Sequence, residues 1–329
     1  MSRIKRIAVL TSGGDCSGMN AAIRAVVRCA IFNGLSVFGV MRGYEGLIKG
    51  DMKQLNRRSV SNIINMGGTI LKTARSKEFM TKNGQRKALR QIAKFKIDGL
   101  AIIGGDGSFR GAHILCADYG VRCIGIPGTI DNDINGTDFT IGSDTAVNVA
   151  LDAIDKIRDT VSSLERIFVV EIMGRECGYI AARVALAGGA EDVLMPEMKF
   201  DMSKICREIN AAHKKGKLSW ILLVAEGVGS AHEVAKIVQK KTGYETRVTV
   251  LGHIQRGGRP TAQDRILAAR LGAKAVELLI QGESDKMAGI VSDRVMAVDL
   301  EFACNQKSNV EENTKKNIEL YKLTKILEA

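Results

Sequence analysis

A chain of 329 residues is long enough for about two domains, and its 45% hydrophobic and 26% charged residues exclude wholesale disorder. The net charge of +12 favours anionic partners. Aromatic residues are only 5% and the basic residues are scattered, which argues against nucleic acid and favours phosphorylated small molecules. Seven cysteines without metal-like spacing, apolar runs shorter than a membrane span of ~18 residues and no signal-peptide pattern lead us to expect a cytoplasmic protein with reduced thiols and no membrane partner.

Short apolar runs alternate with helical stretches along the whole chain. The expected strands are 6–10, 36–41, 99–103, 123–126, 166–173, 218–225 and 245–251. The expected helices are 20–32, 87–95, 108–119, 146–163, 178–188, 202–215, 232–241 and a charged amphipathic helix over 311–327. Continuous apolar strands between helices are typical of parallel sheets covered on both faces, so we expect doubly wound α/β layers.

Glycine-rich segments follow many of the expected strands. They are 11–18, 43–46, 104–107, 128–135 and 174–178. Ligands of doubly wound sheets bind at the carboxyl ends of the strands, so these segments are the candidate binding loops.

The segments 11–18 and 104–108 each join a strand to a helix through Gly-Gly-Asp. Glycine lets a phosphate approach the backbone closely, and a helix N-terminus supplies N–H groups with partial positive charge. A carboxylate such as Asp106 beside a phosphate loop can hold Mg²⁺. The alternatives are a tight turn at 11–18 and an aspartate that caps a helix at 106. The second loop therefore indicates phosphoryl transfer without naming a substrate.

The sharpest segment is Pro-Gly-Thr-Ile-Asp-Asn-Asp at 127–133. If it is extended, Asp131 and Asp133 project to the same side. One carboxylate can then accept a hydroxyl proton while the other holds a metal or positions the first. The alternative is an Asx-rich turn.

Basic residues also follow two expected strands. Arg175 stands in Met-Gly-Arg, and His253 and Arg256 stand in Gly-His-Ile-Gln-Arg-Gly-Gly. Arginine forms bidentate contacts with phosphate, so these residues are candidates for binding a phosphorylated substrate.

Together these segments resemble the bacterial ATP-dependent 6-phosphofructokinase family, in its order and approximate spacing, from Ile4 to about residue 300. The resemblance implies transfer of the ATP γ-phosphoryl group to the 1-hydroxyl of D-fructose 6-phosphate with Mg²⁺. It also implies two doubly wound, Rossmann-like, three-layer domains. The larger, ATP-binding domain would comprise 1–142 with 255–305, and the smaller, fructose-6-phosphate-binding domain 143–254 with 306–329.

The same resemblance assigns roles to individual residues. Asp131 would be the general base and Asp106 the metal ligand. Catalytic residues would be Thr129, Asp131, Asp133, Arg75 and Arg175. The ATP site would contain Gly14, Tyr44, Arg75, Ser76, Gly105, Asp106, Gly107 and Ser108. The sugar phosphate would be bound by Thr129, Ile130, Asp131, Arg166, Met173, Gly174, Arg175, Glu226, Arg247, His253, Ile254, Gln255 and Arg256.

Arg166 and Arg247 resemble two arginines that reach the sugar phosphate from a neighbouring subunit, so a homotetramer with shared sites is expected. An allosteric site for ADP and phosphoenolpyruvate is also implied. Its matching residues are Arg24, Arg28, Arg57, Arg158, Gly189, Glu191, Lys215 and Lys217. Leu218 and Ser219 stand where well-studied members have Lys and His.

Three alternatives stay open on the sequence alone. A pyrophosphate-dependent enzyme would tend to have Asp where this chain has Gly107 and Lys where it has Gly128, and both glycines favour ATP. A non-catalytic nucleotide-sensing subunit would lack the carboxylates, yet Asp106, Asp131 and Asp133 are present. A nucleic-acid-binding protein would show a steep dependence of affinity on salt.

Overall fold

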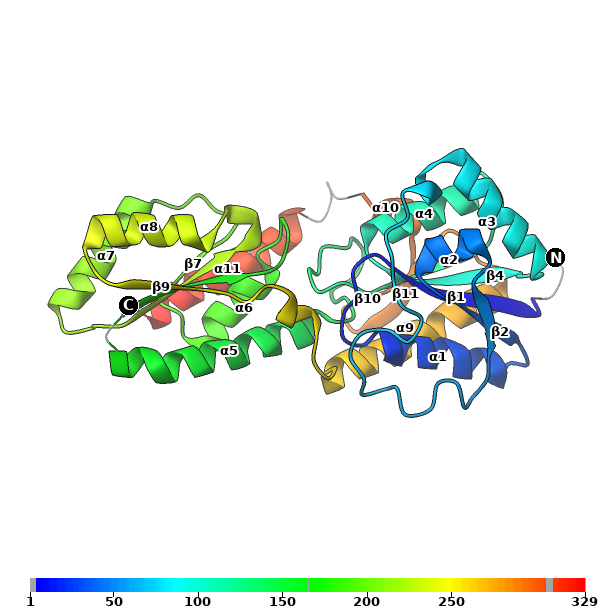
Figure 1. Ribbon diagram of the computed structural model, residues 1–329, viewed down its shortest axis with the longest axis horizontal. Coiled ribbons are helices and arrows are strands. Elements are labelled where there is room, and N and C mark those ends of the chain that lie inside the picture. The colour runs from blue at the N-terminus through cyan, green and yellow to red at the C-terminus, as the bar shows by residue number, and fades with distance from the viewer. Residues whose placement is uncertain (1–3, 165, 306–309, 329) are drawn as a thin grey trace. The chain divides into compact units, whose positions relative to one another are not determined.

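The computed structural model describes residues 4–164, 166–305 and 310–328. By its internal contacts the chain divides into two compact units. Unit 1 is Met1–Thr145 with Arg256–Asn309, and unit 2 is Ala146–Gln255 with Val310–Ala329 (Figure 1). Each unit is therefore discontinuous in sequence.

Unit 1 contains, within the described residues, a seven-stranded sheet in the order β11-β10-β5-β4-β1-β2-β3. The strands β1, β2, β4, β5 and β10 run parallel, whereas β3 and β11 are antiparallel at the edges. Their bounds are β1 (Arg6–Ser12), β2 (Ser36–Val40), β3 (Met52–Leu55), β4 (Gly99–Gly104), β5 (Cys123–Pro127), β10 (Lys286–Val291) and β11 (Arg294–Asp299). The central strands are buried on both faces, which explains their continuous apolar sequence.

Helices cover both faces of this sheet (Figure 1). Helices α1 and α9 pack against each other, and Gly272 permits the approach because a Cβ there would lie 2.7 Å from the Cβ of Ala25. Helices α2, α3 and α4 cover a core that includes Leu10, Leu100 and Phe109. The bounds are α1 (Met19–Phe32), α2 (Gly43–Lys49), α3 (Lys82–Lys94), α4 (Asp106–Ala117), α9 (Ala262–Gln281) and α10 (Leu300–Ala303).

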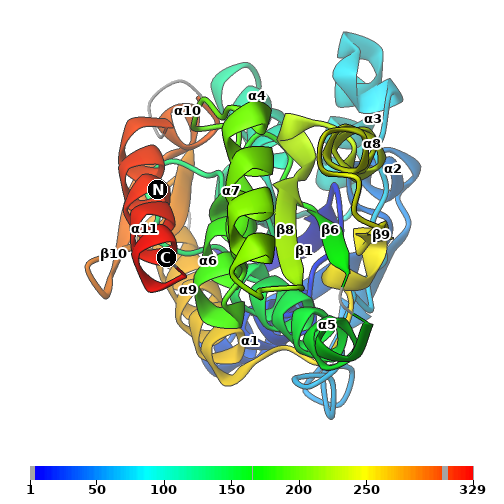
Figure 2. The ribbon, with the colours of Figure 1, turned by 90° about the vertical axis from the view of Figure 1, so that its left-hand side faces the viewer.

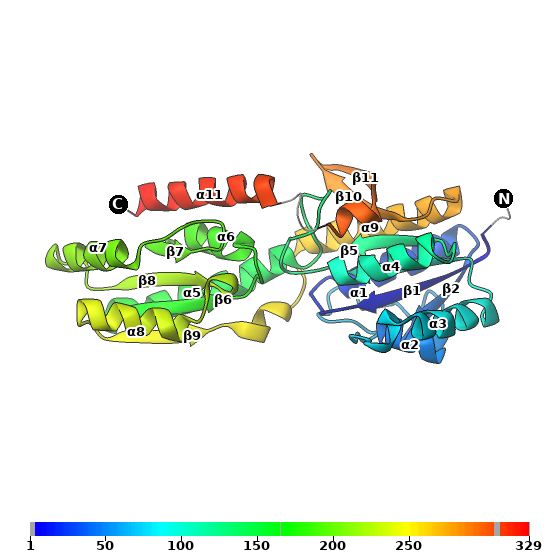
Figure 3. The same ribbon diagram turned by 90° about the horizontal axis from the view of Figure 1, so that it is seen from above.

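The described residues of unit 2 form a four-stranded parallel sheet in the order β7-β8-β6-β9. Helices α7 and α8 cover one core, which includes Val169, Ile205 and Val234. Helix α11 lies beside α6 (Figure 2, Figure 3). The bounds are α5 (Ser143–Leu164), β6 (Ile167–Ile172), α6 (Tyr179–Gly188), β7 (Asp192–Leu194), α7 (Met202–Lys214), β8 (Trp220–Ala225), α8 (Ala231–Thr242), β9 (Thr246–Val250) and α11 (Val310–Leu327).

The predicted alternation of parallel strands and helices is confirmed, but some details differ. The segment 43–46 was expected to be a loop, and it is the first turn of α2. Helix α3 begins five residues before the expected position because the hydroxyl of Thr81 accepts a hydrogen bond from the backbone of Gly84 and caps it. The sequence pattern also missed the edge strands β3, β7 and β11, together with β10 and α9. No helix in the described part of the chain is long and apolar enough to cross a membrane.

Candidate active site

Three of the candidate loops meet at one edge of the sheet in unit 1. Strand β4 lies between β1 and β5, with Gly104 in register with Ser12 on one side and Pro127 on the other. The backbone N–H of Gly128 donates to the carbonyl of Gly104 at 3.0 Å. The carboxyl ends of these strands therefore bring segments 11–18, 104–108 and 127–133 together.

The first turn of α4 is held in place by two hydrogen bonds. The hydroxyl of Ser108 donates to the carbonyl of Ser12 at 3.0 Å, and the hydroxyl of Tyr44 donates to the carbonyl of Ser108 at 2.6 Å. The ring of Tyr44 is buried and stacks on Phe79. Burial raises the pKa of Tyr44 well above its ordinary value, so the hydroxyl remains a donor. Tyr44 thus positions the loop through its hydroxyl.

The N-terminus of α4 suits a phosphate group. Its N-cap is Gly105, and no side chain of the described residues forms a capping hydrogen bond there. A helix N-terminus with partial positive charge and unshielded backbone attracts anions. An added Cβ at Gly107 would meet no described atom within 4 Å apart from its chain neighbours and the adjoining backbone of α4, so this side of the loop is open.

Asp106 lies in the first turn of α4, where its carboxylate pairs with Arg110 at 3.2 Å. It does not cap the helix, because the N-cap is Gly105. Within residues 4–164, 166–305 and 310–328, no group of three or more His, Cys, Asp and Glu residues could hold a metal ion. A single carboxylate beside a phosphate-binding helix fits Mg²⁺, which is usually bound by one or two carboxylates, water and substrate phosphates.

The segment that contains Asp131 is not extended, so the condition under which Asp131 and Asp133 would project to the same side is not met. Asn132 has a left-handed backbone with φ of 52°. Its side-chain oxygen accepts from the N–H of Thr140 at 2.7 Å, and its amide donates to the carbonyl of Asp138 at 3.0 Å. The hydroxyl of Thr140 donates to the carbonyl of Thr129 at 2.7 Å. Asn132 therefore closes the loop on itself.

Asp131 is only 3% exposed and is held by its neighbour. The hydroxyl of Thr129 donates to Oδ2 of Asp131 at 3.3 Å and accepts from the N–H of Asp131 at 3.2 Å. Asp131 thus has a fixed carboxylate at the carboxyl end of β5, next to the loop of Asp106.

Asp264 is a residue whose role the sequence did not reveal. Its carboxylate is fully buried and accepts from the backbone N–H groups of Gly142 and Thr145, each at 2.8 Å, and from the hydroxyl of Thr145. Burial raises the pKa of Asp264, while the hydrogen bonds from Thr145 and Gly142 oppose this change. The available signal was the Asp-Arg pair at 264–265. Asp264 fixes the chain that follows the Asp131 loop to the start of α9.

The other residues of unit 1 that are expected to bind the substrates differ in how far their side chains are exposed. Nη1 of Arg256 donates to the carbonyl of Asp15 at 3.3 Å, and a Cβ at Gly14 would lie 2.5 Å from that nitrogen. The hydroxyl of Ser76 donates to the carboxylate of Glu45 at 2.7 Å. Arg75 is exposed and forms no ion pair in the part of the chain that the structure describes. Arg75 is therefore available for an anionic ligand.

The structure gives a packing reason for the glycine at position 128. A Cβ there would lie 3.1 Å from a methyl group of Ile103 and 3.4 Å from the methyl group of Met19. Close packing against the sheet therefore constrains this position, in addition to any need for space around a nucleotide.

In unit 2, several of the residues expected to bind the sugar phosphate lie at the carboxyl ends of β6 and β8. One oxygen of Glu226 accepts from the N–H groups of Gly174 at 3.2 Å and Arg175 at 3.1 Å. The side chain of Gln255 is buried and accepts from the N–H of Met173 at 2.9 Å. His253 and Ile254 are exposed on the short helical turn Gly252–Arg256, which follows β9. Glu226 and Gln255 thus shape the segment 173–175.

Arg166 and Arg247 lie at the other end of the same sheet. Arg166 precedes β6, and Arg247 is in register with Phe168 near the start of that strand. Both arginines pair with Glu245: Nε of Arg166 lies 2.8 Å from one carboxylate oxygen, and Arg247 contacts the other. These two arginines therefore do not share an end of the sheet with Met173, Arg175 and Glu226.

The expected allosteric residues are divided between the units. Arg24 and Arg28 lie four residues apart on α1, and Arg57 follows β3, all in unit 1. Unit 2 contains the remaining ones. Arg158 and Lys217 lie near Glu191 and Gly189, and Lys215 is exposed at the end of α7.

The chain is similar to known proteins over most of its length. Residues 6–279 match the family model described as phosphofructokinase. The ATP-dependent 6-phosphofructokinase of Clostridium tetani is 52% identical over 324 residues, covering 98% of this chain and 99% of that protein. The protein of the same name from Halothermothrix orenii is 52% identical over 336 residues, with the same coverage.

Solved structures agree with these matches. The phosphofructokinase of Saccharomyces cerevisiae has a TM-score of 0.88 and 34% identity, covering 97% of this chain and 50% of that one. A pyrophosphate-dependent phosphofructokinase from Marinobacter aquaeolei has a TM-score of 0.82 over 97% of this chain and 92% of that one. Its identity is 23%, so this second likeness shows the fold alone.

Proposed function

The chain belongs to the phosphofructokinase family, and from that premise we propose how its residues carry out the reaction. It is an ATP-dependent 6-phosphofructokinase, a glycolytic kinase that transfers the γ-phosphoryl group of ATP to fructose 6-phosphate, giving fructose 1,6-bisphosphate and ADP. The observation that carries the residue assignments is the junction of three loops at the ends of β1, β4 and β5.

The phosphates of ATP would bind over the N-terminus of α4. The open space at Gly107 and the uncapped first turn support this position within the described chain. The residues assigned to ATP are Gly14, Tyr44, Arg75, Ser76, Gly105, Asp106, Gly107 and Ser108. Asp106 would hold Mg²⁺, which when bound neutralises charge on the phosphates.

Asp131 would act as the general base on the 1-hydroxyl of the sugar. Asp131 follows β5, which pairs with β4, the strand that leads into the Asp106 loop. The hydroxyl of Thr129 fixes the orientation of the Asp131 carboxylate. Thr129, Ile130 and Asp133 would complete the catalytic loop. Arg75 and Arg175 would stabilise negative charge on the transferring group.

The sugar phosphate would be bound by residues from two subunits. Strand β6 has six residues, which span about 20 Å at ~3.3 Å per residue. Met173, Gly174, Arg175 and Glu226 follow the carboxyl ends of β6 and β8, whereas Arg166 and Arg247 lie near the opposite end. A hexose phosphate is much shorter than this separation. One molecule bound by both sets would therefore lie between two copies of the chain, as in the shared sites of the homotetramer that the family resemblance implies.

His253, Ile254, Gln255 and Arg256 would complete the sugar site. Effector binding would use the cationic residues Arg24, Arg28, Arg57, Arg158, Lys215 and Lys217 with Gly189 and Glu191, and ADP and phosphoenolpyruvate have the anionic groups that such residues bind.

A coupled assay with fructose 6-phosphate tests the donor assignment. ATP with Mg²⁺ should give rapid turnover, and pyrophosphate should give little. Removal of Mg²⁺ with EDTA should abolish the ATP reaction, and adding Mg²⁺ back should restore it. Faster turnover with pyrophosphate than with ATP would overturn the assignment.

A further inference from the structure

The cationic cluster of unit 2 consists of Arg158 and Lys217 around Gly189 and Glu191. Nη2 of Arg158 donates to the carbonyl of Gly188 at 2.7 Å and also to that of Gly189. Oε1 of Glu191 lies 3.3 Å from Nζ of Lys217 and 4.0 Å from Nη1 of Arg158. Glu191 is only 4% exposed, and its other oxygen accepts from the N–H of Ile221 at 2.7 Å. One buried carboxylate thus faces two cations, which leaves positive charge for a further anion.

That further anion is supplied by the chain itself. Oε2 of Glu328 lies 3.7 Å from Nζ of Lys217. A Cβ at Gly189 would lie 3.3 Å from Oε1 of Glu328 and 3.6 Å from Nη2 of Arg158. Gly189 has φ of 62° at the end of α6 and leaves this space free of side-chain atoms. The carboxylate of Glu328 therefore pairs with Lys217 and lies beside Gly189, on the same side of the cluster as Arg158.

Helix α11 fixes the position of Glu328. Asn317 is buried, donates to Glu197 at 2.9 Å and accepts from Arg183 at 3.3 Å. Nζ of Lys325 lies 3.1 Å from Asp192 and 3.0 Å from Glu208. Three residues after this anchor the chain reaches Glu328. The contacts of α11 therefore hold the carboxylate of Glu328 in place. Its position does not depend on a single ion pair at the surface.

We propose that Glu328 is a built-in carboxylate ligand that competes with anionic effectors for Lys217. The proposal rests on the proposed effector function of this cluster. An intramolecular group competes at a constant effective concentration, whatever the concentration of the protein. The pair with Lys217 is partly exposed, since the side chain of Glu328 is 25% exposed. Such pairs change affinity modestly, so removing the carboxylate should strengthen effector binding roughly two- to fivefold.

The test uses calorimetric titration of the full-length enzyme with phosphoenolpyruvate. The Kd should fall roughly two- to fivefold in Glu328→Gln. It should stay unchanged in Glu319→Gln, a control that removes an exposed carboxylate from the same helix. In the Lys217→Ala background, phosphoenolpyruvate should bind weakly and Glu328→Gln should have little effect, because the cation that pairs with Glu328 is absent. Equal melting temperatures of Glu328→Gln and the wild type will exclude a loss of folding.

The outcomes separate the proposal from the function on which it rests. If Lys217→Ala weakens binding but Glu328→Gln has the wild-type Kd, the competition is overturned and the effector site remains. If Lys217→Ala leaves the Kd unchanged, or if neither phosphoenolpyruvate nor ADP binds to any variant outside the active site, both the effector assignment and the competition are overturned. Failure of the wild type to phosphorylate fructose 6-phosphate with ATP would overturn the proposed catalytic residues independently.

Discussion

Arg166 and Arg175 stand at opposite ends of strand β6, the first directly before Ile167 and the second three residues after Ile172. Both residues are assigned to the same substrate, yet the extended strand separates them within one chain. This relationship is what makes a site shared between two subunits the simplest physical arrangement.

The first prediction concerns the base. Replacing Asp131 with Ser removes the proton acceptor but little volume, so fructose 6-phosphate should still bind. We expect kcat to fall by about 10²–10⁴-fold, the usual contribution of a general base. Steady-state kinetics and equilibrium binding of the sugar phosphate check both parts. Asp118→Ser, which changes an exposed aspartate after α4, serves as the control, and near-normal kcat in Asp131→Ser would remove Asp131 from this role.

The second prediction concerns the donor site. Gly107→Asp should raise the KM for ATP, because a carboxylate would enter the open space beside the phosphates and repel them. Gly107→Ala is the matched control. Its methyl group meets no atom of the described residues within 4 Å, so it should change the KM much less. Equal effects of Ala and Asp would show that charge at this position does not matter.

The third prediction separates the two substrates. Arg247→Ala should raise the KM for fructose 6-phosphate by about 10–100-fold, since a charge-assisted hydrogen bond contributes about 1.5–3 kcal/mol. The KM for ATP should change little. Arg207→Ala, an exposed arginine on α7, is the control. A parallel rise in both KM values would indicate a general structural effect of the substitution.

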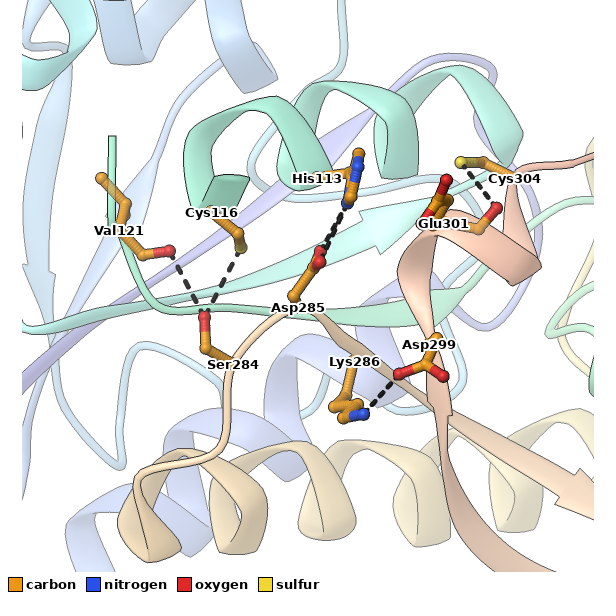
Figure 4. A network of polar contacts seen from close by, with 9 residues as sticks. All are labelled: His113, Cys116, Val121, Ser284, Asp285, Lys286, Asp299, Glu301 and Cys304. Carbon is orange, nitrogen blue, oxygen red and sulfur yellow. Dashed lines mark hydrogen bonds and ion pairs between the residues drawn. The ribbon is translucent and has the colours of Figure 1, made fainter. Parts of the chain in front are cut away.

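The fourth prediction concerns the thiol of Cys116, near the end of α4. A hydrogen bond from the thiol of Cys123 lowers the pKa of Cys116 to about 7, although burial opposes this change. A second hydrogen bond, from the hydroxyl of Ser284 (Figure 4), acts in the same direction. Burial raises the pKa of Cys16 and Cys123. Because the thiolate is the reactive form, alkylation of Cys116 by iodoacetamide should rise about tenfold between pH 6 and pH 8 and level off above that. Peptide mass spectrometry measures each cysteine separately.

Ser284→Ala provides the control for this thiol. It removes the hydroxyl that lies 3.6 Å from the sulfur of Cys116, so the pH midpoint of alkylation should move upward. If Cys116 reacts with a midpoint near that of an ordinary thiol in the wild type, the hydrogen bonds do not stabilise its thiolate.

The sequence predicted the central strands well because buried parallel strands are continuous apolar runs. It missed β11 and β3, which are mostly exposed and antiparallel, and β7, which has three residues. At the candidate site, Asp106 and Asp131 could be proposed from the sequence because their glycine-rich surroundings are distinctive. The roles of Asn132, Glu245 and Asp264 depend on partners brought together by folding. No local pattern marks such contacts, and the left-handed conformation of Asn132 favours the Asx-rich turn over the extended segment.

The most direct test of the shared site is to co-express Asp131→Ser and Arg247→Ala chains and to assay the purified mixture at low fructose 6-phosphate. Each variant alone should be nearly inactive under these conditions. In a random one-to-one mixture, about a quarter of the sites should combine an intact Asp131 with an intact Arg247 from the neighbouring chain. Activity should therefore return to about a quarter of the wild-type value. If each chain contained its own complete site, every site would keep one defect, and activity that stays at the level of the separate variants would contradict the account.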